Sequence, residues 1–245
     1  MIRLILVLLF LLIFFILSIP VFLVEIIIGK FNPRKKEMSS LRIVQFGFRC
    51  IRFLSGTSTT VLGYGNIPKD EAVLFVGNHR SFYDVIIAYS MMPNATGFVA
   101  KKEIEKVPFL RTWMRFINCL FLDRKDIKEG MKTILKGIDL VKNNNTSIVI
   151  FPEGTRNKET EGMLPFHEGS LKIAEKSGCK IVPMVQNNTS WCFEDHFPTI
   201  KRNHTVIEFG EPIDISELSK EDRKFLGAYV QKIMLDMYEK NKELV

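Results

Sequence analysis

The fold is decided by the stretch AVLFVGNHRSFYD, residues 72–84. It opens with an apolar run, residues 72–76, that is typical of a buried strand, and Ser81 is a residue type that often begins a helix. A strand followed at once by a helix would fold Asp84 back toward the ring of His79. A carboxylate on Nδ1–H fixes the imidazole tautomer and leaves Nε2 free to take a proton. The spacing therefore predicts that His79 is a general base oriented by Asp84.

Short β-rich runs alternate with helical patterns along the rest of the chain. The runs cover 73–77, 97–100, 118–122, 147–151, 180–185 and 205–209, and the helical patterns cover 84–92, 127–142, 169–176 and 216–240. Such alternation is typical of α/β domains. The sequence therefore predicts an α/β fold with a mixed or mostly parallel sheet flanked by helices, preceded by an N-terminal membrane helix and an amphipathic helix.

Residues 1–29 form a candidate membrane anchor. The segment 4–24 is apolar apart from Ser18 and Pro20, and at about 1.5 Å per residue it is long enough to cross a hydrocarbon core of roughly 30 Å. Four basic residues follow it: Lys30, Arg34, Lys35 and Lys36. This bias predicts that the rest of the chain faces the cytosol. Two alternatives are a cleaved signal peptide, which the length disfavours, and a hairpin broken at Pro20 that enters one leaflet.

Residues 30–56 are predicted to form a basic amphipathic segment at the membrane surface. On a helical wheel of residues 41–54, charged and apolar side chains fall on different sides, as in a helix that lies in the headgroup layer. The arginines are Arg42, Arg49 and Arg52, and the apolar residues are Leu41, Val44, Phe48 and Ile51. An amphipathic helix packed on the domain explains the pattern equally well. One helix that links the anchor to the core would satisfy both interpretations.

The charge and the cysteines narrow the class of protein further. The net charge is +7, which suits either nucleic acid or anionic lipid. The chain contains no arginine-rich or aromatic RNA-binding motif, so the apolar N-terminus favours the membrane and excludes nucleic acid as a partner. The four cysteines form no CxxC pair, which argues against a zinc site and against a disulfide framework.

Three further clusters follow apolar runs. The first is FPEGTR, residues 151–156, where glycine permits close backbone approach, threonine offers a hydroxyl and arginine offers a planar fork for phosphate. The second is LFLDR, residues 120–124, and the third is IVPMV, residues 181–185. Taken singly, the first cluster is equally consistent with a β-turn, the second with a surface ion pair and the third with a buried strand. Strand ends are, however, where α/β sheets bind ligands.

Together the clusters resemble the glycerolipid acyltransferase family, which contains the 1-acyl-sn-glycerol-3-phosphate acyltransferases. The family's N-H-x-S-x-x-D and F-P-E-G-T-R blocks are complete at residues 78–84 and 151–156, and its V-P-like block lies at 181–185. Its second block is looser, because Asn118 stands where the family commonly has glycine. A Lys-x-Glu region is present at residues 101–103, and Arg111 replaces a further glycine. The resemblance covers roughly residues 60–210.

The resemblance implies that residues 57–245 are an acyltransferase catalytic domain. It implies transfer of a fatty acyl group from acyl-CoA or acyl carrier protein to the free hydroxyl of lysophosphatidic acid (1-acyl-sn-glycerol-3-phosphate), with no metal and no cofactor. His79 and Asp84 would be catalytic. The implied substrate-binding residues are Glu153, Gly154, Thr155, Arg156, Arg124, Lys101 and Lys102. Arg156 is the first candidate for the acceptor's phosphate, and Glu153 would hold an acceptor hydroxyl or orient Arg156.

Three alternatives stay open on the sequence alone. The acceptor could be glycerol-3-phosphate or another lysophospholipid. Water could replace the acceptor, which would make the protein a membrane-bound lipid or thioester hydrolase. The fold could also serve a lipid-binding protein without activity, although such a protein has no use for a poised base at His79. His167, in the loop that follows the FPEGTR cluster, is assigned a peripheral role.

Overall fold

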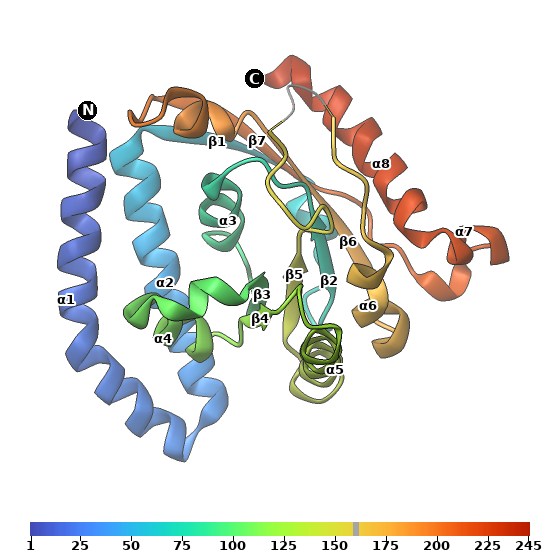
Figure 1. Cartoon of the computed structure of the whole chain (residues 1–245), viewed down its shortest axis with the longest axis horizontal. Coiled ribbons are helices and arrows are strands. Elements are labelled where there is room, and N and C mark those ends of the chain that lie inside the picture. Colours follow the sequence, from blue (N-terminus) through green and yellow to red (C-terminus); the bar gives the residue numbers. More distant parts are fainter. Residues whose placement is uncertain (159–161) are drawn as a thin grey trace.

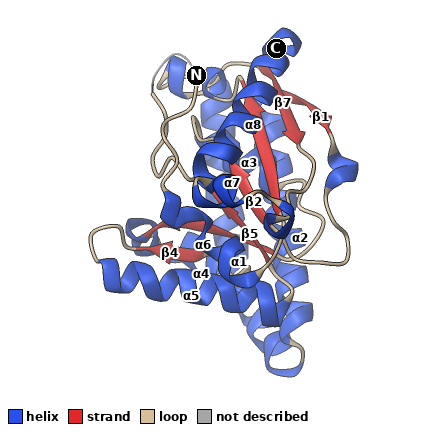
Figure 2. Ribbon diagram, turned by 90° about the vertical axis from the view of Figure 1, so that its right-hand side faces the viewer, coloured by secondary structure: helices blue, strands red, loops and turns tan. Residues whose placement is uncertain are grey.

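The computed structural model describes residues 1–158 and 162–245, and a seven-stranded sheet forms the centre of this part of the chain (Figure 1). The strands are β1 (Thr57–Leu62), β2 (Leu74–Gly77), β3 (Thr96–Lys101), β4 (Leu120–Leu122), β5 (Ser147–Ile150), β6 (Ile181–Asn187) and β7 (Asn203–Phe209). Their order in the sheet is β1-β7-β6-β2-β5-β3-β4, with β1 and β7 at one end and β4 at the other (Figure 2). Only β6 and β7 pair antiparallel among these strands, so the predicted mostly parallel sheet is confirmed.

Helices cover both faces of the sheet (Figure 1). They are α1 (Ile2–Phe31), α2 (Pro33–Ser55), α3 (Phe82–Tyr89), α4 (Pro108–Phe116), α5 (Ile127–Asn144), α6 (Lys172–Ser177), α7 (Lys220–Lys224) and α8 (Leu226–Asn241). Phe75 and Val149 belong to the core shared with α1–α4, whereas Leu74 and Ile148 belong to the core shared with α5, α6 and α8. Central strands buried on both faces read as continuous apolar runs rather than as alternating ones. This burial explains why the sequence revealed β2, β5 and β6 so clearly.

Helices α1 and α2 form an antiparallel hairpin whose bend lies at Asn32 (Figure 1). The Asn32 side chain accepts a hydrogen bond from the Lys35 backbone N–H at 2.9 Å and so caps α2. Helix α1 continues through Pro20, so the chain does not break there. An 18-residue stretch of α1 has a mean hydropathy of 3.3, and within residues 1–158 and 162–245 α1 is the one helix long and apolar enough to cross a membrane.

The hairpin is joined to the sheet domain along its length. Within the hairpin, the Arg3 guanidinium of α1 donates to the Ser55 carbonyl of α2 at 3.0 Å. The Trp113 indole of α4 donates to the Ser18 hydroxyl of α1 at 2.9 Å and so joins the hairpin to the domain. On α2, Leu41 and Ile51 are buried in the core shared with α3. The apolar face of residues 41–54 therefore packs on the domain, which is the second of the two interpretations of that segment, and the helix that contains it spans Pro33–Ser55.

Other elements differ from the sequence-based predictions. Strand β1 was not predicted, because its TSTTVL sequence is mostly polar and the strand lies at the sheet edge. Helix α4 was not predicted either, because it spans only nine residues, of which Pro108 is the first. The expected C-terminal helix 216–240 is divided into α7 and α8 at Phe225. Ser219 begins α7 by accepting a hydrogen bond from the Asp222 N–H.

Candidate active site

The carboxyl ends of β2, β5 and β6 lie side by side, and the loops that follow them converge. Because β2 pairs in parallel with both β5 and β6, the three strands end at the same edge of the sheet. The loop after β2 carries His79, the loop after β5 carries residues 153–156, and the segment after β6 carries Thr189 and Glu194. This is the edge at which α/β sheets bind ligands.

His79 and Asp84 form the hydrogen-bonded pair that their spacing predicted. The Nδ1 atom of His79 lies 2.9 Å from Oδ2 of Asp84. Asp84 is fully buried, whereas the His79 side chain keeps 20% of its surface exposed. The pair is close because Ser81 caps α3 and Asp84 completes the capping box: its carboxylate accepts the Ser81 N–H at 2.7 Å. The predicted role of Ser81 as a helix cap is confirmed.

Three further donors hold the Asp84 carboxylate. Besides His79, its Oδ2 accepts the backbone N–H groups of Arg80 at 2.6 Å and Ser81, and its Oδ1 accepts the Thr189 hydroxyl at 2.5 Å. A carboxylate that already accepts from these groups is an acceptor toward the imidazole as well. The proton of neutral His79 therefore sits on Nδ1, and Nε2 carries the free lone pair.

A stacked phenylalanine fixes the plane of the His79 ring. The Phe151 ring lies 4.4 Å from it, centroid to centroid, at an angle of 16°. Gly77 makes this approach possible, because a Cβ atom at that position would lie 2.9 Å from both the Phe151 ring and the Met184 methyl group. Phe151 is thus the member of the FPEGTR segment that touches the base, although the sequence suggested no such role.

Glu153 is a buried clamp rather than an exposed ligand. Only 3% of its surface is exposed, and its two carboxylate oxygens accept the backbone N–H groups of His79 at 2.7 Å and Leu164 at 2.8 Å. Burial raises the pKa of Glu153, and the two backbone donors only partly offset that rise. Glu153 therefore fixes the backbone that carries His79. The alternative in which Glu153 orients Arg156 is not what the structure shows, because Arg156 pairs with another acid.

That acid is Glu194, which lies in the segment after β6. Its Oε1 lies 3.1 Å from the Arg156 guanidinium and accepts the Phe82 N–H at 2.8 Å, while its Oε2 accepts the Ser81 hydroxyl at 2.6 Å. The guanidinium also stacks over the Phe82 ring, 4.1 Å from the ring centroid. Arg156 is therefore held at the N-terminal end of α3, which lies between His79 and Asp84 in the sequence, and stays partly exposed.

Two more basic side chains flank the β5 loop at Gly154. This glycine has a φ of 71°, in the left-handed region that glycine adopts without strain. A Cβ atom there would lie 3.0 Å from the His167 ring and 3.8 Å from an Arg124 guanidinium nitrogen. Arg124 is thus brought to the predicted loop, and His167 lies closer to it than the sequence indicated. Thr155 is exposed on the same loop.

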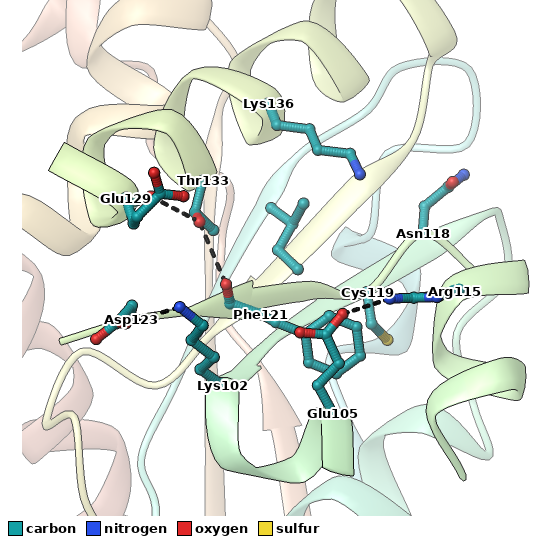
Figure 3. A pocket seen from close by; sticks show the side chains of 11 residues that line it. Lys102, Glu105, Arg115, Asn118, Cys119, Phe121, Asp123, Glu129, Thr133 and Lys136 are labelled. Atoms are coloured by element: carbon teal, nitrogen blue, oxygen red, sulfur yellow. Dashed lines mark hydrogen bonds and ion pairs between the residues drawn. The ribbon is translucent and has the colours of Figure 1, made fainter. Parts of the chain in front are cut away.

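Lys101 and Lys102 lie at the exposed end of β3, where Lys102 borders a different cavity. Lys102 pairs with Asp123 at 2.9 Å, and Arg115 pairs with Glu105 at 2.6 Å. These pairs line a cavity of about 530 Å³ that runs along β4, with Lys136 pointing into it from α5 (Figure 3). The substrate-binding roles of Lys101 and Lys102 stay predictions.

Asn118, where the family commonly has glycine, occupies a left-handed backbone position. Its φ is 55°, a conformation that costs glycine nothing and that asparagine tolerates better than most residues. The departure from the family pattern therefore preserves the turn into β4. Arg111, the second departure, lies on α4, where its guanidinium donates to the Glu105 carbonyl at 3.4 Å.

Thr189 and Glu194 are the two polar side chains of the site that the sequence did not reveal. Both follow β6, more than a hundred residues from the catalytic pair, and neither belongs to a block that had been recognised. The available signal was positional. Polar side chains that follow a buried strand of a parallel sheet lie at the ligand-binding edge, and residues 188–196 meet that condition.

Replacing Thr189 with valine tests whether this residue positions Asp84. The Thr189→Val variant keeps the shape of the side chain but removes the hydroxyl donor to Oδ1 of Asp84. Hydrogen bonds to charged groups contribute about 1.5–3 kcal/mol, so we expect kcat to fall roughly tenfold or more while KM stays near its original value. Steady-state kinetics of acyl transfer measures both constants. Thr189→Ser should restore kcat, and an unchanged kcat in the valine variant would show that Asp84 needs no such support.

Comparison with known proteins adds evidence that is independent of the geometry. A family model described as Acyltransferase matches residues 58–187, more than half of the chain. The 1-acyl-sn-glycerol-3-phosphate acyltransferase of Saccharomyces cerevisiae is 30% identical over 198 residues, which cover 80% of this chain and 64% of the yeast protein. The Helicobacter pylori protein of the same name is 35% identical over 166 residues, which cover 68% of this chain and 67% of that protein.

A solved structure extends the similarity over the whole chain. The crystal structure of the 1-acyl-sn-glycerophosphate (LPA) acyltransferase PlsC from Thermotoga maritima superposes with a TM-score of 0.76 at 25% sequence identity. The match covers 98% of each chain, so it includes the helical hairpin as well as the sheet domain. With the family match over residues 58–187 and the paired His79 and Asp84 at the sheet edge, these similarities show that the chain belongs to the acyltransferase family.

Proposed function

We propose that this enzyme transfers a fatty acyl group from a thioester to the free hydroxyl of 1-acyl-sn-glycerol-3-phosphate, giving phosphatidic acid for phospholipid biosynthesis. The observation that carries the proposal is the His79–Asp84 pair, which leaves Nε2 free at the same edge of the sheet from which the Arg156 loop extends. The names of the yeast and Helicobacter pylori relatives and of the Thermotoga maritima structure support this acceptor.

The chemistry follows from the free Nε2 of His79. As the acceptor hydroxyl attacks the thioester carbonyl, Nε2 takes its proton and a C–O bond forms. The tetrahedral intermediate then expels the thiolate by breaking the C–S bond, and the imidazolium returns the proton to sulfur. Asp84 stabilises the imidazolium that forms in between. Such general acid–base catalysis contributes about 10²–10⁴-fold in rate, and the sequence of steps needs no covalent enzyme intermediate.

Arg156 is the proposed ligand of the acceptor's phosphate. Its guanidinium is partly exposed and immobilised between Glu194 and Phe82, so little rotamer entropy is lost when phosphate binds. Arg124 lies near Gly154 of the same loop and supplies a second positive charge. Glu153, being buried, contributes through the His79 backbone rather than through the acceptor.

We expect Arg156→Ala to raise the KM for lysophosphatidic acid and to leave the KM for the acyl donor unchanged. A charge-assisted hydrogen bond contributes about 1.5–3 kcal/mol, so the increase should be roughly tenfold or more. Steady-state titration of each substrate at saturation of the other separates the two constants. Arg156→Lys should show an intermediate value, because lysine keeps the charge without the planar fork. An unchanged acceptor KM would remove Arg156 from the phosphate site.

The enzyme associates with membranes, and α1 is the contact. Its outward-facing side chains are large, apolar and exposed, among them Leu9, Leu12, Ile16 and Leu23. We further propose that the catalytic domain lies on the cytosolic face, where both thioester donors, acyl-CoA and acyl carrier protein, are found. The basic residues Lys30 and Lys35 next to the hairpin bend agree with the positive-inside bias.

Acyl transfer by purified wild-type protein and by His79→Ala, with a panel of acceptors, tests the function. Lysophosphatidic acid, glycerol-3-phosphate and a lysophosphatidylcholine are each offered with one labelled acyl donor. We expect labelled phosphatidic acid from the first acceptor, and its formation should depend on His79. Product from another acceptor would correct the substrate, and labelled free fatty acid formed equally with and without acceptor would show a hydrolase instead.

A further inference from the structure

A second cavity lies at the end of α3 that is remote from the catalytic pair. Its volume is about 640 Å³, and its walls come from α2, from β1 and the segment that follows it, and from the C-terminal end of α3. It is lined by Arg42, Gln45, Arg49, Val61, Tyr64, Ser90, Met91, Met92 and Pro93. Ser90 at the cavity follows Asp84 by six residues, so at about 1.5 Å per residue roughly 9 Å of helix separates the cavity from Asp84.

The positive charges at this cavity have no carboxylate partner within the described lining. Arg42 bonds only to neutral oxygens, Oε1 of Gln45 at 2.8 Å and the Pro93 carbonyl at 3.3 Å. Arg49 is exposed, and its guanidinium has no hydrogen bond or ion pair with residues 1–158 or 162–245. A cation that the protein leaves without a counterion is available to an anionic ligand.

A third arginine strengthens the positive potential next to the cavity. Arg52 donates to the Ser90 hydroxyl at 2.9 Å, and its Nε is buried without a partner among the described residues. Burial lowers the pKa of Arg52, and the nearby charge of Arg49 lowers it further. An anion bound between two positive charges reduces their mutual repulsion and favours their charged forms. The basic cluster therefore behaves as a site whose counterion comes from outside the chain.

The surroundings of the cavity match a lipid better than a free anion. Along α2, Arg42, Phe46, Arg49 and Phe53 recur at spacings of four, three and four residues, so they share one side of the helix. Phe46 and Phe53 are 57% and 84% exposed, and the cavity wall itself includes Val61 and the two methionines. Arginine and exposed aromatic side chains in one stripe are typical of helices that contact lipid headgroups.

We propose that this cavity binds the phosphate headgroup of an anionic phospholipid, at a site separate from the one that contains His79. Arg42 and Arg49 contact the phosphate, the Tyr64 and Ser90 side chains border the headgroup, and Phe46 and Phe53 lie among the upper acyl chains. The lipid is bound as a ligand and is not consumed. The bound lipid thereby fixes the orientation of the α1–α2 hairpin relative to the membrane. The apolar surface of α1 attaches the hairpin to the membrane, and the lipid holds one point on α2 at the headgroup layer.

Vesicle binding by full-length protein tests the site with phosphatidylglycerol as the probe, since that lipid is neither acceptor nor product of the proposed reaction. Co-flotation is measured with phosphatidylcholine vesicles with and without phosphatidylglycerol. Each arginine near an anionic surface contributes about fivefold in affinity, from about 1 kcal/mol. Phosphatidylglycerol should raise the vesicle affinity of the wild type, and we expect this increase to be about 25-fold smaller for Arg42→Gln/Arg49→Gln. For Arg49→Glu, which removes no internal hydrogen bond, the increase should be at least fivefold smaller.

The matched control removes two charges from the same hairpin but away from the cavity. Lys30→Gln/Lys35→Gln changes exposed residues at the hairpin bend and should keep most of the phosphatidylglycerol gain. Equal losses in the two double variants would overturn the proposal in favour of general electrostatic attraction, and no loss in Arg49→Glu would overturn it directly. Inorganic phosphate added at a concentration matching the headgroups should not release the protein. If it does, the site binds free phosphate instead of lipid.

Discussion

The purified His79→Ala variant is expected to lose acyl transfer by about 10²–10⁴-fold in kcat. Its Nε2 is the free basic atom at the sheet edge, because Nδ1 is committed to Asp84. Without it, the acceptor hydroxyl keeps its proton during attack and the thiolate leaves without a general acid. The fold should be preserved, since His79 is partly exposed and its ring packs chiefly on Phe151.

His204→Ala provides a matched control for the loss of a histidine. His204 lies on β7 near the far end of the sheet and bonds to the Ser58 and Thr60 hydroxyls of β1. It should retain acyl transfer while losing some thermal stability. Melting temperature, vesicle association and turnover are measured for both variants. Full turnover by a folded His79→Ala protein would exclude the proposed mechanism, whatever the acceptor.

Asp84→Asn is expected to reduce kcat by a factor as large as that of His79→Ala, with little loss of stability. The introduced carbonyl oxygen takes the place of Oδ2, and the introduced amide donates to the Thr189 hydroxyl, which is able to turn and accept. The hydrogen-bonded geometry is then kept, but the negative charge that stabilises the imidazolium is gone. We therefore expect kcat to fall while the free energy of unfolding stays near its original value. Steady-state kinetics measures the first quantity, and chemical denaturation measures the second.

Asp84→Ala should damage the fold as well as the activity. The alanine leaves the buried N–H groups of Arg80 and Ser81 without an acceptor and removes half of the capping box of α3. The Arg80 donor without a partner costs about 1–3 kcal/mol, and the lost helix cap, which includes the Ser81 donor, costs about 1 kcal/mol. The free energy of unfolding should therefore fall by about 2–4 kcal/mol. If the asparagine variant turned over like wild type, Asp84 would be a structural residue only.

The sequence predicted the central part of the sheet well because that part is buried on both faces. Strands β2, β5 and β6 appear in it as unbroken apolar runs, and all residues of these strands are buried in the structure. Edge elements gave a weaker signal. In β1 the pattern is carried by threonines, and pairing with β7 rather than hydrophobicity holds the strand in place. Secondary structure of this kind depends on a distant partner, which a local pattern does not contain.

The catalytic pair was predictable because it is local. His79 and Asp84 are five residues apart, and a strand end, a helix cap and the first turn of a helix bring them together without help from distant segments. The membrane-directed start was equally local, since length and hydropathy suffice to define it. The bend between α1 and α2 at Asn32 was not predicted. The apolar pattern continues past Pro20 to the end of α1, and the packing of α2 against α1 is what shows that the chain turns back at Asn32.

The sequence by itself determined the α/β class, the base with its orienting carboxylate, and the arginine-bearing loop after β5. Tertiary structure alone decided how these parts act on one another. Thr189 reaches Asp84 across 105 residues, Glu194 reaches Ser81 across 113, and Glu153 turns inward to hold His79 across 74. Such contacts depend on the order in which strands pair, and sheet order is set by the packing of both faces at once. The amino-acid sequence therefore identifies the residues of the site but does not give the distances between them.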